Sequence, residues 1–397
     1  MAYDPVNNEQ LVESQAEVFR DISEFLTELT ANEVLDGNTN AEYLSSVESW
    51  LQFKQKSYQR LFEEAAKQAD KAIAAIPTSI TNAVEIAYSI GEQTAAAELL
   101  AAGITPDVSG GFQTLSQYAL DGLMDAAINR MGNRVNKLNI VNGVQDAFRE
   151  ATESAAALVL SGGATLEDAT EIAVNSLLDK GLKTINVGNR KMGIDAYAET
   201  SIRTIAGNAQ VQGSIDRYED ADQYLSFVTD SPMECELCRP YEGKVIRTTN
   251  DLEKIPPKFH EVPSLDTAKA DGLFHPNCTH SLQVYIDGYS EPPTDTDDSV
   301  NGDRRSKIRR LQKLEKTNRL KEKIYRENGS KNRAAGAKKR AAKYKAERRR
   351  LENLLERNSL GWFTGEQRLR RLAESVNIPV EVLDQAKGNL PQLNKLV

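Results

Sequence analysis

The residues of this chain best suited to hold a metal ion are gathered in one short window. Among 397 residues there are only three cysteines and three histidines: Cys235, Cys238, Cys278, His260, His275 and His280. All six fall between positions 235 and 280. An odd number of cysteines without an export signal argues against a disulfide framework, so this clustering favours thiolates gathered around a metal.

The spacing of these residues resembles two halves of a structural zinc site. Cys235-x2-Cys238 is followed, after 36 residues, by His275-x2-Cys278. Zinc in structural sites takes four tetrahedral ligands from thiolates and imidazoles, and a two-residue spacing lets one tight turn present two of them. We therefore predict one structural Zn²⁺ bound by Cys235, Cys238, His275 and Cys278, with His280 as the reserve fourth ligand.

Two other interpretations of the cluster stay open. In the first, the cysteines are free and buried and the histidines lie on the surface. In the second, the zinc is catalytic. A catalytic zinc needs an open coordination position, and the His-Glu-x-x-His pattern of zinc proteases is absent because no second histidine follows His260-Glu261 at that spacing. The His-x-Glu followed by Pro-Cys-x-x-Cys of nucleobase deaminases is also absent, so a structural zinc is favoured.

The elements that must position this cluster are mainly helices. Apolar residues recur at helical spacing over 9–30, 42–75, 80–102, 113–131, 143–160, 165–180 and 195–218. Thr165 is the expected N-cap of one helix, with Ile172 on its buried stripe and Gly181 after its end. Pro77 is expected to end the helix before it. The helix over 42–75 either packs on its neighbours or forms a coiled coil with another copy, in which Lys54 would interrupt the heptad.

The pattern changes after residue 220. Short β-branched and aromatic runs at 224–229 and 244–248 predict strands on either side of the first cysteine pair. Residues 288–303 are rich in Gly, Ser, Pro, Thr and Asp, which is typical of a linker. Residues 304–357 are basic and helix-prone, with apolar residues too sparse for a buried face, and Gly329 and Gly336 are expected to break them into pieces.

The predicted fold is mainly α: an elongated helical body with a small zinc-stapled α+β module and a basic C-terminal helical arm. The expected divisions are a helical body over 1–190, the zinc module over 191–290, a linker over 291–303, the basic arm over 304–357 and a small helical end-piece over 358–397.

The charge of the chain is unevenly distributed. Residues 1–300 hold 22 Lys and Arg against 47 Asp and Glu, whereas residues 301–397 hold 27 against 11. The balances of −25 and +16 give the net charge of −9. Such an asymmetry predicts that the basic part meets an anionic partner.

Nucleic acid is the first candidate for that partner. Lysine and arginine contacts to phosphates would give binding without sequence preference. The residues expected to make them are Lys338, Lys339, Arg340, Lys343, Lys345, Arg348, Arg349 and Arg350. A solvated helical face, or docking on the acidic first 300 residues of a neighbouring copy, are the alternatives.

No segment of the sequence looks like a signal peptide or a membrane span. The first ten residues lack a basic and an apolar region, and no later window approaches eighteen uninterrupted apolar residues. We expect a soluble protein of the cytoplasm, or of a particle assembled there, without contact to a membrane.

The motifs also resemble those of a known family. Cys-Glu-Leu-Cys-Arg-Pro-Tyr-Glu-Gly-Lys-Val at 235–245 and Gly-Leu-Phe-His-Pro-Asn-Cys-Thr-His at 272–280 are similar to phage minor capsid proteins, which are related to phage Mu F-type head morphogenesis proteins. The resemblance covers about 195–290 closely, and Thr279 stands where relatives often have a basic residue.

The resemblance implies a non-enzymatic component of the phage head. Such a protein would be part of the virion, after assembly in the host cytoplasm, and would contact the portal or the major capsid protein, with self-association as a further expectation. It would assist head assembly, DNA packaging or ejection, with packaged DNA as the partner of the basic arm. The alternative is a zinc-containing DNA-binding or nuclease protein of a mobile element.

Overall fold

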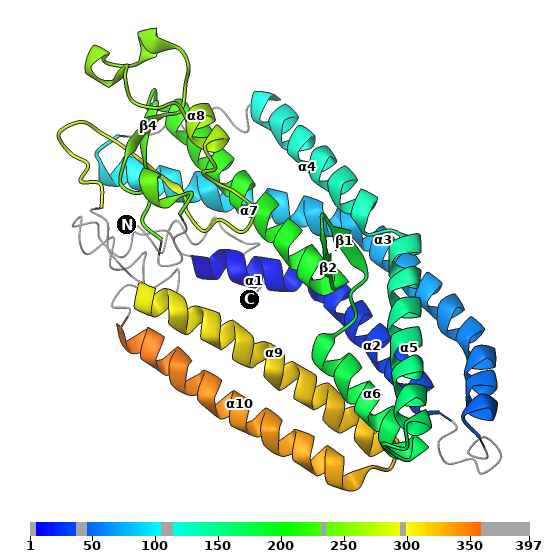
Figure 1. Cartoon of the computed structure of the whole chain (residues 1–397). Helices are drawn as coiled ribbons and strands as arrows, with labels where there is room; N and C mark the ends of the chain where they lie inside the picture. Colours follow the sequence, from blue (N-terminus) through cyan, green and yellow to red (C-terminus); the bar gives the residue numbers. More distant parts are fainter. Residues whose placement is uncertain (1–4, 37–45, 105–113, 232–235, 294–298, 359–397) are drawn as a thin grey trace, which may run out of the picture.

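The structure is mainly helical, as the sequence predicts, and elongated (Figure 1). This computed structural model describes residues 5–36, 46–104, 114–231, 236–293 and 299–358. The predicted end-piece therefore lies outside the described residues, apart from its first position. None of the described helices is both long enough and apolar enough to span a membrane.

The body is built from helices that surround one long helix. They are α1 (Pro5–Gln15), α2 (Glu17–Leu35), α3 (Val47–Ala101), α4 (Thr114–Arg134), α5 (Lys137–Leu160), α6 (Leu166–Lys180) and α7 (Ile194–Glu219). A short hairpin of β1 (Ile185–Val187) and β2 (Arg190–Met192) precedes α7. The central helix, α3, contacts α1, α2, α4, α5 and α7, and its buried side chains Trp50, Leu61, Ile76 and Ile80 anchor the main core.

The predicted helix end at Pro77 is wrong, because α3 continues through this residue to Ala101. An interior proline removes a backbone hydrogen bond and costs about 3 kcal/mol. Pro77 itself is exposed, whereas Ile76 and Ile80 on either side of it are buried in the main core. Apolar burial on both sides therefore outweighs the local cost, and α3 changes direction along its length (Figure 1).

The predicted ends of α6 are confirmed. The Thr165 hydroxyl accepts a hydrogen bond from the backbone N–H of Asp168 at 3.1 Å, and Gly181 follows the helix with a φ of 67°. The predicted stripe is wrong at one position, because Ile172 is 50% exposed. The buried face instead includes Thr170 and Glu171.

Helices α3 and α7 approach each other so closely that two glycines are required. A Cβ atom on Gly91 would lie 2.1 Å from the backbone oxygen of Gln210, and one on Gly213 would lie 2.3 Å from that of Tyr88. The Ser214 hydroxyl donates to the backbone oxygen of Gly91 at 3.1 Å, and the Tyr88 hydroxyl donates to Asp216 at 2.7 Å. This crossing fixes α7 along the body.

We predict that Gly91→Ala destabilises the protein by at least about 2 kcal/mol, because the added methyl must push two helix backbones apart. Gly122→Ala is the matched control: Gly122 lies exposed within α4 with open space where the methyl would be added, so alanine should stabilise the helix by up to about 1 kcal/mol. Urea denaturation measures both. Equal effects of the two substitutions would contradict the close crossing.

Lys54, which interrupts the predicted heptad, is buried where α3 meets the end of α2. Its side chain is 2% exposed in the structure. The ammonium donates hydrogen bonds to the backbone oxygens of Glu33 and Asp36 and lies 5.5 Å from the centre of the Trp50 ring. It thereby satisfies carbonyl groups at the C-terminus of α2. Burial lowers the pKa of Lys54 to about 8, against the attraction of Asp36 and Glu33.

This buried lysine predicts a specific pH dependence of stability. Between about pH 8 and pH 10.5 the unfolded chain binds a proton at Lys54 more tightly than the folded chain does, so stability rises as the pH rises through this window. We expect Lys54→Met to remove a rise of roughly 2–3 kcal/mol in the free energy of unfolding. The exposed Lys56→Met on the same helix should keep it. Denaturation at pH 7.5 and 10.5 tests this, and an unchanged rise in Lys54→Met would contradict it.

The module after α7 contains a three-stranded antiparallel sheet in the order β4-β3-β5. The strands are β3 (Leu225–Val228), β4 (Val245–Arg247) and β5 (Leu282–Val284), and the short helix α8 (Leu265–Ala270) lies between the last two in sequence. The strands predicted at 224–229 and 244–248 are thus confirmed. Helix α7 serves both parts of the molecule: Ile194 to Ala209 contribute to the main core, and Val211 and Ile215 to a second core under this sheet.

The basic arm is a helical hairpin, α9 (Ser299–Glu327) and α10 (Lys331–Asn358). The predicted break at Gly329 is confirmed, with a φ of 79°, but the break at Gly336 is wrong because this residue lies inside α10. The expectation that the arm buries no face is also wrong. Its buried positions include Ile308, Leu311, Glu315, Ile324, Tyr325 and Ala337.

The hairpin is attached to α2 and α6 near its turn by pairs of opposite charge, and Ile324 of α9 joins the main core. Lys321 binds Asp179 and Lys323 binds Glu28, each at 2.7 Å. Arg333 contacts the nearly buried carboxylate of Glu171, which also accepts a hydrogen bond from Ser330. The arm thus docks on acidic residues of its own chain, which is the kind of contact the sequence suggested for a neighbouring copy.

Candidate metal centre

A small apolar core supports the predicted metal-binding residues. It is formed by side chains from α7, the sheet, α8 and the connecting loops: Val211, Ile215, Val228, Cys238, Ile246, Leu265, Ala268, Leu273 and Leu282. Cys238 is fully buried within this core. The apolar core of the module therefore encloses the side chain of Cys238.

The topology of the sheet brings distant residues to one place. Strands β4 and β5 both pair antiparallel with β3, so they run in the same direction and begin at the same end of the sheet. Cys238 precedes β4, with Gly243 forming the intervening turn at a φ of 68°, and Cys278 and His280 precede β5. Residues about 40 positions apart in sequence thus meet at this end of the sheet.

Three potential ligands meet there. The two Sγ atoms of Cys238 and Cys278 are 3.6 Å apart, and Cys278 Sγ lies 3.3 Å from Nδ1 of His280. The three ligand atoms all lie within 4.8 Å of one another. His280 is 4% exposed, so the group is closed off from solvent on the histidine side.

Glu242 orients the histidine from behind. Its side chain is 2% exposed, and Oε1 lies 2.5 Å from Nε2 of His280. Nε2–H donates to the carboxylate, which leaves Nδ1 directed toward the two sulfur atoms. A carboxylate behind a ligating histidine is a frequent arrangement in metal sites, because it fixes the tautomer and the ring orientation. Glu242 is not among the residues predicted from the sequence to form the site. The signal that could have pointed to it is the Glu-Gly turn between the first cysteine pair and β4.

The electrostatics of the group favour a thiolate. The hydrogen bond with Cys238 lowers the pKa of the Cys278 thiol, burial opposes this, and the imidazole of His280 adds to the lowering. Burial disfavours the charged form of His280, but Cys278 and Glu242 outweigh burial and raise the pKa of the imidazole. Thiolates are the form in which cysteine binds metals, so these neighbours prepare Cys278 for that role.

Two of the three separations between these ligand atoms are close to those around a tetrahedral zinc ion. Zinc–sulfur bonds of about 2.3 Å and zinc–nitrogen bonds of about 2.0–2.1 Å place two sulfur ligands about 3.8 Å apart and a sulfur and a nitrogen about 3.6 Å apart. The observed separations of 3.6 and 3.3 Å are close to both values. Cys235 lies outside the described residues, three positions before Cys238.

The structure does not bring His275 into this group. Its imidazole is half-buried, and Nδ1 lies 2.8 Å from the backbone oxygen of Pro276. His280, the reserve ligand, occupies the position by the thiols instead. A signal for this was present in the sequence: residues two apart in an extended segment share a face, so Cys278 and His280 project together on the approach to β5.

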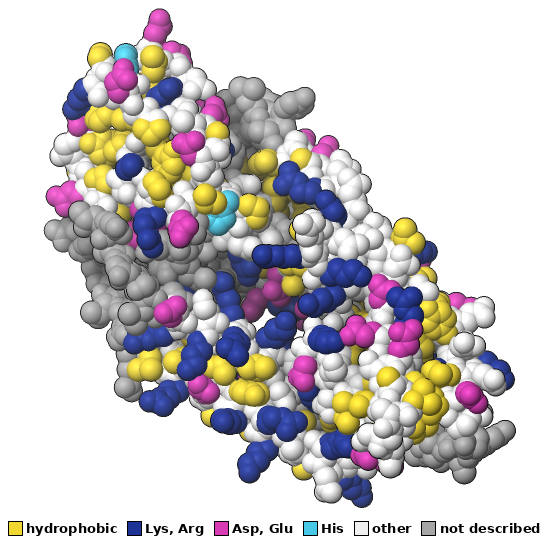
Figure 2. All heavy atoms as spheres, viewed as in Figure 1, with side chains coloured by type: hydrophobic (Ala, Val, Ile, Leu, Met, Phe, Trp, Pro, Cys, Tyr) yellow, Lys and Arg dark blue, Asp and Glu magenta, His cyan; other side chains and the backbone are white. Residues whose placement is uncertain are grey.

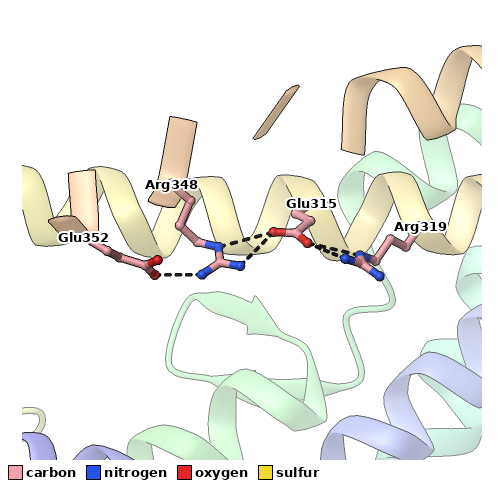
Figure 3. Close-up of polar contacts among 4 residues, drawn as sticks. All are labelled: Glu315, Arg319, Arg348 and Glu352. Atoms are coloured by element: carbon pink, nitrogen blue, oxygen red, sulfur yellow. Dashed lines mark hydrogen bonds and ion pairs between the residues drawn. The ribbon is translucent and has the colours of Figure 1, made fainter. Parts of the chain in front are cut away.

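The eight residues predicted to bind nucleic acid fall into two groups on α10. Lys338, Lys339, Lys343, Arg349 and Arg350 are exposed, and Lys345 is half-buried. Arg348 instead lies between Glu315 and Glu352, with Nη1 2.7 Å from Glu352 (Figure 3). The Nε of Arg340 donates to Asn318 at 2.9 Å. Arg348 and Arg340 thus hold α10 against α9.

Comparison with known proteins identifies the family. A protein described as "Structural protein" of Lactococcus phage LL-H is 24% identical over 183 residues, which cover 44% of this chain and 48% of that protein. The aligned part thus spans about half the length of this relative. No solved structure matches the chain. The family model for "Phage minor capsid protein 2" matches residues 9–357, from α1 to the end of α10. The resemblance in the cysteine and histidine motifs is thereby confirmed, and the chain belongs to the phage minor capsid protein 2 family.

Proposed function

We propose that the protein is a non-enzymatic structural component of the phage head, present in few copies at the portal vertex or on the inner face of the capsid. The observation that carries this proposal is the family match over residues 9–357, which includes the body, the module and the basic hairpin. In this role the helical body contacts the portal or the major capsid protein. The protein then assists head assembly, DNA packaging or ejection.

The module would act as a rigid joint stabilised by one structural Zn²⁺. The ligands would be Cys238, Cys278 and His280, with Cys235 completing the set, and Glu242 would hold the imidazole in place. The support is the donor chemistry and spacing of the three described ligands, together with the burial of Cys238 and His280. The strands they join have only three or four residues each, so metal binding would supply free energy for folding of the module.

A structural ion is favoured over a catalytic one by the surroundings of the ligands. Catalytic zinc keeps one position open to water and substrate, whereas structural zinc is enclosed by four protein ligands. Here Cys238 is fully buried and the side chain of His280 is 1% exposed. In the nuclease alternative, His260 would be the histidine that acts in hydrolysis. Its Nε2 already lies 2.9 Å from the backbone oxygen of Ile255, so this nitrogen is engaged within the protein.

We expect purified protein to contain about one zinc per chain. His280→Ala should lose the metal, and its matched control His275→Ala should retain it, because only His280 faces the thiols. Glu242→Gln should weaken zinc retention against a chelator by about 10–100-fold. Elemental analysis and chelator competition measure these outcomes. Metal loss in His275→Ala but not in His280→Ala would overturn this ligand set, and metal-free wild-type protein would overturn the site.

For the role in the head, we expect the protein in purified particles at a small fraction of the copy number of the major capsid protein. Crosslinking mass spectrometry should join its helical body to the portal or to the inner capsid surface. Absence from particles, combined with plasmid cleavage that His260→Ala abolishes, would instead support the nuclease alternative.

A further inference from the structure

The outward surface of α10 has an unusual composition. The exposed positions between 331 and 353 are Lys331, Asn332, Ala335, Lys338, Lys339, Arg340, Ala342, Lys343, Ala346, Arg349, Arg350 and Asn353. This set contains no acidic residue and no apolar side chain larger than alanine. Figure 2 shows Lys and Arg side chains gathered along the edge of the molecule where Figure 1 places α9 and α10.

The two sides of the hairpin differ in how their charge is compensated. Toward the body, Lys321, Lys323 and Arg333 form ion pairs with acidic residues of α2 and α6. On the outward side, Lys338, Lys339, Lys343, Arg349 and Arg350 form no ion pair with a described residue, and the same holds for Arg310, Lys313 and Lys316 on α9. The outward surface is therefore a strip of positive charge that no ion pair within the described part of the chain compensates.

We propose that this strip binds the phosphate backbone of double-stranded DNA without sequence preference. From Lys338 to Arg350 the helix extends for about 18 Å, a length over which duplex DNA carries roughly ten phosphates. Ala342 and Ala346 are exposed between the basic positions. Because no long side chain projects there, a DNA strand can approach the helix closely. Neither the zinc site nor the place of the protein in the head enters this inference.

The residue types distinguish a duplex from other anionic partners. Binding of single strands relies on aromatic side chains that stack on bases, but Tyr325 is buried and Tyr344 is half-buried. Protein interfaces are depleted in lysine and depend on large apolar or aromatic anchors at their centre, which this strip lacks. A regular, densely charged polyanion is the partner that fits a surface of lysine, arginine and alanine.

The structure also limits which basic residues take part. Arg348 is bound by Glu315 and Glu352, and Arg340 by Asn318. These two arginines position α10 on α9 and are not counted among the phosphate contacts. The structure thus narrows the eight residues suggested by the sequence to Lys338, Lys339, Lys343, Arg349 and Arg350.

The test compares two triple variants of the full-length protein that lose the same charge. Lys339→Ala, Lys343→Ala and Arg350→Ala remove three outward charges from α10. The control, Lys56→Ala, Lys71→Ala and Lys183→Ala, removes three exposed lysines from the body. Fluorescence anisotropy with two 30-base-pair duplexes of unrelated sequence, and with one single strand, measures binding from 50 to 200 mM salt.

We expect wild-type protein and the control to bind both duplexes equally and more tightly than the single strand. The α10 variant should bind at least about tenfold more weakly at low salt, and the slope of log affinity against log salt should fall by up to about 2.7. An unchanged thermal midpoint shows that all variants are folded. Equal losses in both variants, absence of duplex binding at 50 mM salt or tighter single-strand binding would each overturn the proposal.

Discussion

The close crossing of α3 and α7 holds the body and the module together. Gly91 and Gly213 allow two helix backbones to touch, and no larger residue fits at either position without moving a helix. Because α7 contributes its first part to the main core and Val211 and Ile215 to the second, the same contact sets the module on the body. The body and the module are therefore joined through one continuous helix, α7, and not through a loop.

The module shows how little regular structure is needed to form a candidate metal centre. The short strands β4 and β5 lie on either side of β3 and begin at the same end of the sheet. The segments that precede them contain Cys238, Cys278 and His280. Glu242, on the turn leading into β4, fixes the imidazole from the side away from the sulfur atoms. The sheet brings the three ligand side chains close together, and the Glu242 carboxylate orients the imidazole of His280. A metal site needs both.

Opposite charge organises the C-terminal hairpin. Its turn end is held by pairs such as Lys321–Asp179 and Arg333–Glu171, while Glu315 joins Arg319 and Arg348 between the two helices (Figure 3). The acidic residues of the chain thus compensate the inner side of the arm and leave the outer side positive. The charge asymmetry visible along the sequence becomes an asymmetry between two faces of one hairpin.

The elements with strong local signals could be predicted from the sequence alone. Helical periodicity, the Thr165 cap and the Gly181 end defined α6, and short β-branched and aromatic runs defined β3 and β4, because these signals act over a few residues. Tertiary packing makes α3 continue through Pro77, since the burial of Ile76 and Ile80 outweighs the local cost of the proline. It likewise decided that the arm buries a face and that His280, not His275, lies by the thiols. Both outcomes depend on contacts between residues far apart in sequence, and spacing along the chain does not contain that information.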